Sequence, residues 1–150
     1  MPRLCELAFE AKASWGYPRE WLELWRADLI YDERTLREQC VIVAELERRV
    51  TGVCSFSCRG EDADLEGLWI DPALTRQGLG RTLLNEAIRR AALCGAVRMR
   101  VVAEPRAEAF YLRLGAQRVG TQPSQPPGRV LPELLLELRT RAAEREHAQR

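Results

Sequence analysis

Residues 64–95 hold the feature that most restricts the fold of this chain: a strand pattern, then a glycine-containing loop, then a helix pattern. Apolar alternation from Leu65 to Ile70 predicts the strand, and Asp-Pro at 71–72 predicts a turn. After Arg-Gln-Gly-Leu-Gly at 76–80, apolar residues recur with the period of a helix that ends at Gly95. The predicted buried side of this helix holds Leu79, Leu83, Leu84, Ala87, Ile88 and Ala91.

The loop before this helix has the chemistry of an anion site. The first four N–H groups of a helix have no partner inside the helix and lie at the positive end of its dipole. Gly78 and Gly80 lack the Cβ atoms that would shield this backbone, so a phosphate can approach it. An ordinary tight connection between strand and helix is the alternative. The sequence has no Gly-Lys-Ser/Thr and no third glycine with a downstream acid, so neither a Walker loop nor a dinucleotide motif is present.

The remaining patterns predict an α/β (α+β) chain with a mixed sheet. Helices are expected over 4–13, from Pro18 to about 29, and over 107–114, with one helical turn at most within 32–39. Strands are expected over 40–47, 50–58, 97–103, 116–120 and 129–138, with a Pro-rich loop at 121–128. A meander followed by alternating helices and strands predicts a central, mostly antiparallel sheet flanked by helices. We expect one domain over 1–138 and a charged tail over 139–150.

Three motifs follow one another along the chain. They are Leu-Trp-Ile-Asp-Pro at 68–72, Arg-Gln-Gly-Leu-Gly-Arg-x-Leu-Leu at 76–84 and Phe-Tyr-x-x-Leu-Gly-Ala at 110–116. Together they resemble the GNAT superfamily of acyl-CoA-dependent N-acetyltransferases, and residues 11–17 and 123–132 resemble segments of a small bacterial subgroup. The resemblance implies a GNAT-like fold and transfer of an acetyl group from acetyl-CoA to a primary amine, by direct attack in a ternary complex and without a metal. A catalytically inactive acyl-CoA-binding module or interaction subunit is the alternative.

The resemblance also implies which residues hold coenzyme A. The backbone of Leu68, Trp69 and Ile70 would pair with the pantetheine arm, and the pyrophosphate would lie over Arg76, Gln77, Gly78, Leu79, Gly80, Arg81 and Thr82. Gly67, in mid-strand, predicts a bulge or a close backbone approach. Many members carry an Asn after the following strand to hold pantetheine, where this chain has Glu104-Pro105-Arg106.

The chemistry needs a base, because an amine must lose its proton before it attacks a thioester. Strict alternation would place the even-numbered residues of 64–70 on one face of the strand. Glu66 corresponds most nearly to the catalytic glutamate of the family, which often acts through water; a solvated or structural carboxylate is the alternative, and Asp64 is the second choice of base. Tyr111 matches the family tyrosine that protonates or hydrogen-bonds the leaving thiolate, with a packed aromatic as the alternative.

The acceptor amine is expected near the connection between the first two helices, which lines the acceptor site in GNAT folds. Trp15 and Tyr17 lie there, and each fits a pocket role as well as core packing. Asp64 is the third candidate for the acceptor site. Lys12 could bind an acidic substrate group, although a solvated lysine is the simpler interpretation. These residue types do not choose between a small-molecule amine and a peptide amine.

Composition excludes several classes of partner. The formal net charge is +1, so no excess charge points to nucleic acid or to an anionic membrane. No apolar run approaches the ~20 residues of a membrane span, and no signal-like segment follows Met1. The five cysteines form no Cys-x-x-Cys pair, so we expect reduced thiols and a cytoplasmic location. The single histidine, His147, lies in the tail, which leaves no material for a His-based metal site.

The start of the chain departs from the family pattern. The family opens with a strand before its first helix, and here only residues 1–3 precede Leu4. Without that strand, residues 40–47 become an apolar edge of the sheet, and proteins normally cover or pair such an edge. We therefore expect a homodimer or a covering segment.

Overall fold

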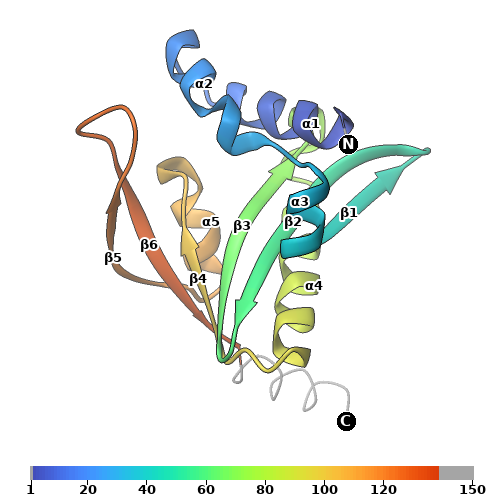
Figure 1. Cartoon of the computed structure of the whole chain (residues 1–150), viewed down its shortest axis with the longest axis vertical. Helices are drawn as coiled ribbons and strands as arrows, with labels where there is room; N and C mark the ends of the chain where they lie inside the picture. The colour runs from blue at the N-terminus through green and yellow to red at the C-terminus, as the bar shows by residue number, and fades with distance from the viewer. Residues whose placement is uncertain (1, 139–150) are drawn as a thin grey trace. The chain divides into compact units, whose positions relative to one another are not determined.

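The computed structural model describes residues 2–138, which form a mixed sheet flanked by helices (Figure 1). The helices are α1 (Pro2–Ala13), α2 (Arg19–Trp25), α3 (Glu33–Glu38), α4 (Leu79–Leu93) and α5 (Glu108–Arg113), with 3₁₀ turns η1 (Arg26–Leu29), η2 (Pro72–Leu74) and η3 (Pro105–Ala107). The strands are β1 (Cys40–Leu46), β2 (Arg49–Arg59), β3 (Asp62–Ile70), β4 (Arg98–Val102), β5 (Gln117–Pro123) and β6 (Val130–Glu137). They form a six-stranded sheet in the order β1-β2-β3-β4-β6-β5. The predicted fold class is confirmed.

Contacts within the chain define two compact units. Among the described residues, unit 1 comprises 2–57 and 66–87, and unit 2 comprises 58–65 and 88–138. The strand β3 and the helix α4 each contribute one part to each unit. The single domain over 1–138 stays a prediction, and the charged tail over 139–150 lies outside the described residues.

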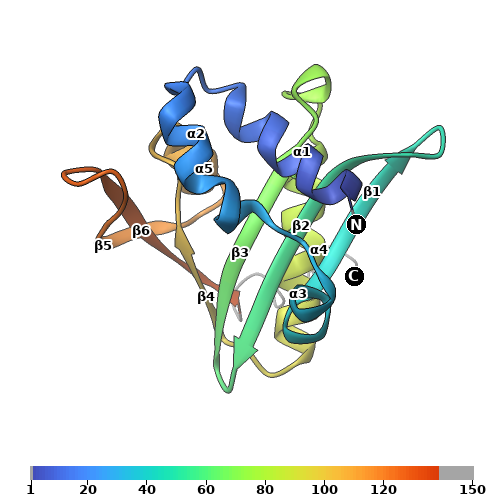
Figure 2. The ribbon, with the colours of Figure 1, turned by 45° about the horizontal axis from the view of Figure 1, so that its top comes forward.

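Unit 1 packs helices on both sides of β2. On one side, α1 buries Leu4, Leu7 and Ala8 in a cluster with Leu29, Tyr31 and Val53. On the other side lies α4, as Figure 2 shows. The approach of α4 depends on Gly52, because a Cβ there would lie 2.8 Å from Leu83 Cδ1. A side chain at position 52 would therefore push this helix away from the strand.

Two helical predictions in unit 1 need correction. The helix expected from Pro18 to about 29 divides into α2 and the 3₁₀ turn η1, which bends the chain before Tyr31. The turn expected within 32–39 is the helix α3, because Asp32 accepts a hydrogen bond from Thr35 N at 2.9 Å and so caps its first turn.

The strand β3 begins at Asp62, earlier than the predicted Leu65. Gly60, with φ +61°, allows a tight turn from β2, so the residues after it pair at once. Residues 62–65 pair in parallel with β4, from Asp62 opposite Arg98 to Leu65 opposite Val101. The first half of β3 therefore belongs to unit 2.

Unit 2 joins β4, β6 and β5 in antiparallel pairs. The expected loop over 121–128 is shorter than predicted, because β5 continues to Pro123, which pairs with Val130. Proline is tolerated there because β5 is an edge strand of the sheet. The carbonyl of Pro132 in β6 accepts a hydrogen bond from Ala103 N at 2.9 Å.

A nearly buried ion pair fixes the turn between β5 and β6. Arg129 donates to Glu104 Oε2 at 3.0 Å, and both side chains are only 9% exposed. A second guanidinium nitrogen of Arg129 lies 3.3 Å from Ser124 Oγ across the turn. Glu104, in the segment 104–106 where the sequence resemblance implied an Asn that this chain lacks, therefore has a structural partner 25 positions along the chain.

We expect Arg129→Met to destabilise the protein by about 3 kcal/mol, because it leaves the Glu104 carboxylate buried without its cation. Urea unfolding followed by circular dichroism measures this loss. The exposed pair of Arg34 with Glu38 provides the control, and Arg34→Met should lower the stability far less than Arg129→Met. Equal costs for the two variants would contradict the structural role of the Arg129 pair.

Candidate acetyl-donor site

The loop between β3 and α4 is fixed at its first residue, Asp71. The Asp71 N–H donates to Thr51 O at 2.8 Å, and its carboxylate accepts from Ala73 N at 3.0 Å. The guanidinium of Arg3, on α1, lies 3.5 Å from the same carboxylate. The start of the loop is therefore tied to both β2 and α1.

The end of the loop presents the N-terminus of α4 with open space beside it. Arg76 and Gly78 both have left-handed backbone, with φ of +66° and +80°. A Cβ at Gly78 would meet no atom within 4 Å. The Gly78 carbonyl accepts from Thr82 N at 3.0 Å, which closes the first turn of the helix and leaves the preceding N–H groups pointing outward.

The charge of this loop favours an anion. Arg76 and Arg81 are exposed, and the sequence has no acidic residue between Pro72 and Asn85. Their positive charge adds to the positive end of the helix dipole. The residues predicted to hold the pyrophosphate, 76–82, thus lie together at one helix terminus, in a backbone arrangement that fits a phosphate group.

The two faces of β2 show to which side of the sheet each side chain of β3 points. The β1–β2 register is regular from Gly52 to Phe56, so successive β2 residues alternate between two faces. Gly52 lies on the α4 face, and Ser55 and Ser57 lie on the opposite face. Ile70 of β3 is on the α4 face, because its Cδ1 lies 3.1 Å from the Cβ position of Gly52.

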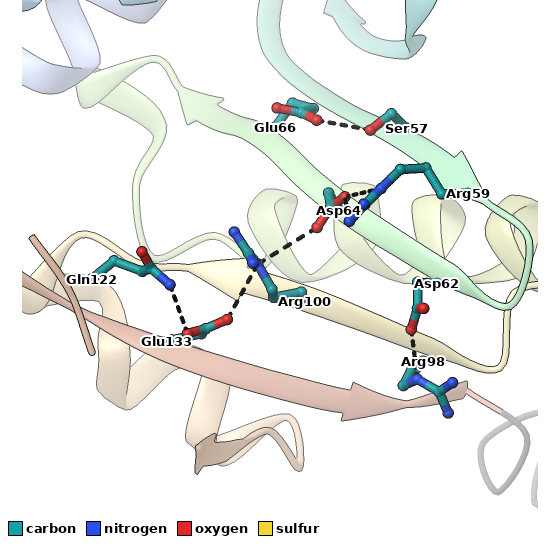
Figure 3. Close-up of polar contacts among 9 residues, drawn as sticks. All are labelled: Ser57, Arg59, Asp62, Asp64, Glu66, Arg98, Arg100, Gln122 and Glu133. Atoms are coloured by element: carbon teal, nitrogen blue, oxygen red, sulfur yellow. Dashed lines mark hydrogen bonds and ion pairs between the residues drawn. The ribbon is translucent and has the colours of Figure 1, made fainter. Parts of the chain in front are cut away.

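Glu66 and Gly67 interrupt the alternation of β3. Ser57 Oγ donates to Glu66 Oε1 at 2.8 Å (Figure 3), and a Cβ at Gly67 would lie 3.3 Å from Ser55 Oγ. Two consecutive residues therefore face the same side, which is the signature of a bulge. The sequence predicted a bulge or a close backbone approach at Gly67; the close approach is confirmed, and we infer the bulge from the side-chain directions. The expectation that Asp64, Glu66, Leu68 and Ile70 share one face is wrong.

Asp64, the second choice of base, is engaged in ion pairs within unit 2. Arg59 donates to Asp64 Oδ2 at 2.8 Å, and Arg100 Nε lies 3.6 Å from Asp64 Oδ1. Arg100 also lies 3.3 Å from Glu133, which accepts from Gln122 (Figure 3). Both oxygens of the Asp64 carboxylate are therefore engaged by arginine side chains.

A buried polar group that sequence reasoning missed lies beside the bulge. The Tyr31 hydroxyl is 3.2 Å from Ser55 Oγ, and the two residues are 5% and 1% exposed. A Cβ at Gly67 would lie 2.7 Å from Tyr31 Oη and 2.8 Å from Trp69 Nε1. No local sequence pattern predicts this contact, because Tyr31, just after η1, and Gly67, in β3, lie far apart in the sequence.

The aromatic side chains near the α1–α2 connection pack on one another. Tyr17 stacks on Trp21 with ring centroids 5.9 Å apart and meets Trp25 edge to face at 4.9 Å. The Lys12 ammonium lies 4.5 Å from the Trp25 ring centroid, which corrects the expectation of a solvated lysine. Trp15 is half-buried on the same connection. The structure therefore gives Tyr17 a packing role and leaves a role in the acceptor site untested.

Tyr111 lies on α5 of unit 2 and is 7% exposed. Its ring meets Phe110 edge to face, with centroids 5.0 Å apart. The Tyr111 carbonyl accepts hydrogen bonds from Leu114 N and Ala116 N, and Gly115, with φ +96°, ends the helix. The position of Tyr111 is therefore fixed by the termination of the helix that carries it.

Residues 2–138 give little evidence for a metal site, a cysteine nucleophile or a membrane-spanning helix. A surface cavity of about 630 Å³ lies between α1 and η1 and contains none of the predicted site residues. No group of acidic, cysteine or histidine side chains in this part of the chain could hold a metal ion. All five cysteines are free thiols, and burial raises the pKa of Cys54 to about 12, so this thiol is a poor nucleophile. No helix of the described residues is long and apolar enough to span a membrane.

A mixed sheet in which β3 leads through a glycine-containing loop into the open N-terminus of α4 is the arrangement that the sequence resemblance implied. The chain belongs to the acetyltransferase (GNAT) family, whose model matches residues 2–116. Both the fold expected from the sequence and the family resemblance are thereby confirmed, and membership supports acetyl transfer from coenzyme A in general.

Solved structures share this fold at low sequence identity. PaiA N-acetyltransferase from Thermoplasma acidophilum, in complex with coenzyme A, is 18% identical with a TM-score of 0.71 over 91% of both chains. Ribosomal-protein-S18-alanine N-acetyltransferase from Escherichia coli is 19% identical with a TM-score of 0.67, over 91% of this chain and 86% of that one. An aminoglycoside 6'-N-acetyltransferase complexed with coenzyme A is 14% identical with a TM-score of 0.68, over 91% and 89%. No curated protein matches the sequence significantly.

Proposed function

We propose that this protein transfers the acetyl group of acetyl-CoA to a primary amine by direct attack in a ternary complex. The N-terminus of α4 is the observation that carries the proposal. The backbone at Gly78 has open space beside it, and the exposed side chains of Arg76 and Arg81 add positive charge to the same loop. Coenzyme A carries a pyrophosphate, and this terminus has the charge and exposed N–H groups that a pyrophosphate requires. The coenzyme A complexes of two structural neighbours support the same co-substrate.

The bulged half of β3 would hold the rest of the donor. Acetyl-CoA supplies the acetyl group as a thioester. The backbone of Leu68, Trp69 and Ile70 follows the bulge directly and would bind the pantetheine arm. An N–H group there would also polarise the carbonyl, which is typically worth a few kcal/mol in the transition state.

Glu66 would act as the base, directly or through a water molecule. Its carboxylate is exposed and is held by Ser57 rather than by a cation. The contrast with Asp64, which is paired with Arg59 and Arg100, favours Glu66. For the acceptor site we propose Trp15 and Tyr17, on the connection between α1 and α2, as the family resemblance implies.

The acceptor would be a small-molecule or peptide amine. The names of two structural neighbours contain such acceptors, an aminoglycoside and the alanine of a ribosomal protein. Five free thiols support a reducing, cytoplasmic location.

Tyr111 would protonate or hydrogen-bond the leaving thiolate. We expect Tyr111→Phe to lower kcat about tenfold rather than abolish turnover, because a thiol with a pKa near 8.5 leaves with little help. Thiol release measured at saturating acetyl-CoA reports this change. An unchanged kcat would mean that Tyr111 serves only as a packed aromatic beside Phe110.

The exposed edge of the sheet supports a homodimer. The strand β1 ends the strand order, and it exposes Val43 by 46% and Leu46 by 56%. We expect a dimer in size-exclusion chromatography with light scattering, and Val43→Lys should produce monomers, because a charge on an edge strand opposes pairing. A monodisperse wild-type monomer at high protein concentration would count against the dimer.

The proposed function is tested by calorimetric titration with acetyl-CoA, followed by a screen of amines for thiol release. We expect micromolar binding and turnover with at least one amine. Binding without turnover on any amine would support the alternative, an inactive acyl-CoA-binding module. Failure of the wild-type protein to bind acetyl-CoA would overturn both versions.

A further inference from the structure

The Tyr31 cluster, which consists of the buried Tyr31 and Ser55 and the half-buried Trp69, lies against the bulge beside Glu66. We propose that Tyr31 is a positioning residue for acetyl transfer: its hydroxyl occupies the space of a side chain at Gly67 and thereby fixes the bulge. The effect of Tyr31 on catalysis rests on the proposed function, whereas the contact between Tyr31 and Gly67 does not depend on it. Tyr31 reaches the strand from outside the three motifs that identify the family.

The contact is close enough to fix the backbone. A Cβ at Gly67 would lie 2.7 Å from Tyr31 Oη and 2.8 Å from Trp69 Nε1, both below the separations that real Cβ atoms show. Only glycine allows the strand to lie this near to the two polar groups. The absence of a side chain at Gly67 therefore makes room for the Tyr31 hydroxyl. The strand β3 cannot move any closer to the Tyr31 cluster.

Hydrogen bonds hold the Tyr31 ring in this position. An indole N–H can only donate, so the Tyr31 hydroxyl accepts from Trp69. Between the hydroxyls of Tyr31 and Ser55, which are 3.2 Å apart, either can donate. Burial raises the pKa of the Tyr31 phenol above its ordinary value, although the bonds with Ser55 and Trp69 lower it in part. The phenol therefore stays protonated at neutral pH. The backbone of Tyr31 is also bonded to α1, since its N–H donates to Cys5 Sγ at 3.2 Å.

The break in side-chain alternation at Glu66 and Gly67 determines which face of β3 carries the Glu66 carboxylate. The bulge allows Glu66 to face Ser57 while Gly67 faces the Tyr31 cluster. If the bulge relaxed toward regular alternation, the Glu66 side chain would turn to the opposite face, away from Ser57. Removing the Tyr31 hydroxyl removes one of the two polar groups that oppose this relaxation, and Trp69 Nε1 remains.

A double-mutant cycle tests the contact without reference to activity. Gly67→Ala in the wild-type background places a methyl group against Tyr31 Oη, and in the Tyr31→Phe background that oxygen is gone. We expect Gly67→Ala to lower the thermal unfolding midpoint more in the wild type than in Tyr31→Phe. Some loss should persist in both backgrounds because Trp69 Nε1 remains close. Equal losses in the two backgrounds would overturn the proposal.

Kinetics then test the positioning role. We expect Tyr31→Phe to lower kcat about tenfold with the acetyl-CoA dissociation constant changed less than about twofold, because misplacing a catalytic group affects the reaction more than binding. In the Glu66→Gln background, Tyr31→Phe should have little further effect, since it acts through Glu66. Additive effects, or a wild-type kcat in Tyr31→Phe, would overturn the proposal.

Thr51→Val is the matched control. Thr51 lies on β2 with Ser55, is 5% exposed, and its hydroxyl bonds Ala44 O rather than the Tyr31 cluster. We expect the kcat of Thr51→Val to stay within about twofold of the wild type, even if its thermal unfolding midpoint falls as much as that of Tyr31→Phe. Parallel losses of rate in both variants would overturn the proposal in favour of general loosening. An inactive wild type would contradict the proposed function, and the Gly67 cycle would still decide whether the contact exists.

Discussion

Glu66→Gln should lower kcat about hundredfold while the affinity for acetyl-CoA stays the same. An alkyl amine with a pKa near 10.4 is almost wholly protonated at pH 7, which costs about 4 kcal/mol before it can attack. The carboxylate of Glu66 can take up that proton, and the amide of glutamine cannot. Glutamine is otherwise nearly isosteric and can still accept the hydrogen bond that Ser57 donates at 2.8 Å.

The pH profile separates this role from a structural one. The defect of Glu66→Gln should shrink as the pH rises toward the pKa of the amine, because a neutral amine needs no base. A defect of constant size at every pH would contradict the base assignment. Stopped-flow or steady-state thiol release between pH 6 and about 9.5 gives the profile.

Asp64→Asn provides the comparison for Glu66→Gln. It removes the charge that Arg59 and Arg100 share but leaves Glu66 and Ser57 in place. We expect kcat within about fivefold of the wild type, because Arg59 and Arg100 hold the Asp64 carboxylate away from a reacting amine. If Asp64→Asn were the more damaging variant, the roles of the two carboxylates would have to be exchanged.

Local patterns predicted the parts of this fold that local physics determines. The helix after Gly78 followed from its apolar period and from Gly95, and the structure has α4 over Leu79–Leu93. The strand pattern found β3 but missed its first residues, because Asp62 and Asp64 are held by pairing with β4 and by arginines far along the chain. Pairing partners of that kind leave no periodic signal.

The same distinction applies to the candidate site. The glycine loop was predictable because a helix terminus creates its own anion site wherever it occurs. The faces of β3 were not, because a bulge shifts every residue beyond it to the other side and depends on contacts with other strands. The Tyr31 cluster and the Glu104–Arg129 pair were missed for the same reason, since each joins residues at least 24 positions apart.

Gly78→Asp should weaken acetyl-CoA binding at least about hundredfold, because it brings a negative charge next to the pyrophosphate. The carboxylate also competes for the same N–H groups, since Asp is a favoured residue before the first turn of a helix. The substitution should therefore not unfold α4. Calorimetric titration measures the affinity, and thermal unfolding confirms that the variant is folded.

Two controls separate charge from backbone strain at this position. Gly78→Asn adds a side chain of the same shape without the charge, and Asn tolerates left-handed backbone nearly as well as any residue except glycine. It should retain most of the affinity. Gly128→Asp places the same acid at a glycine of similar φ, +92°, in the turn between β5 and β6, where a Cβ would also meet nothing within 4 Å. It should bind acetyl-CoA like the wild type. If Gly78→Asn and Gly78→Asp were equally impaired, shape rather than charge would govern the loop, and if both bound normally the pyrophosphate would have to lie elsewhere.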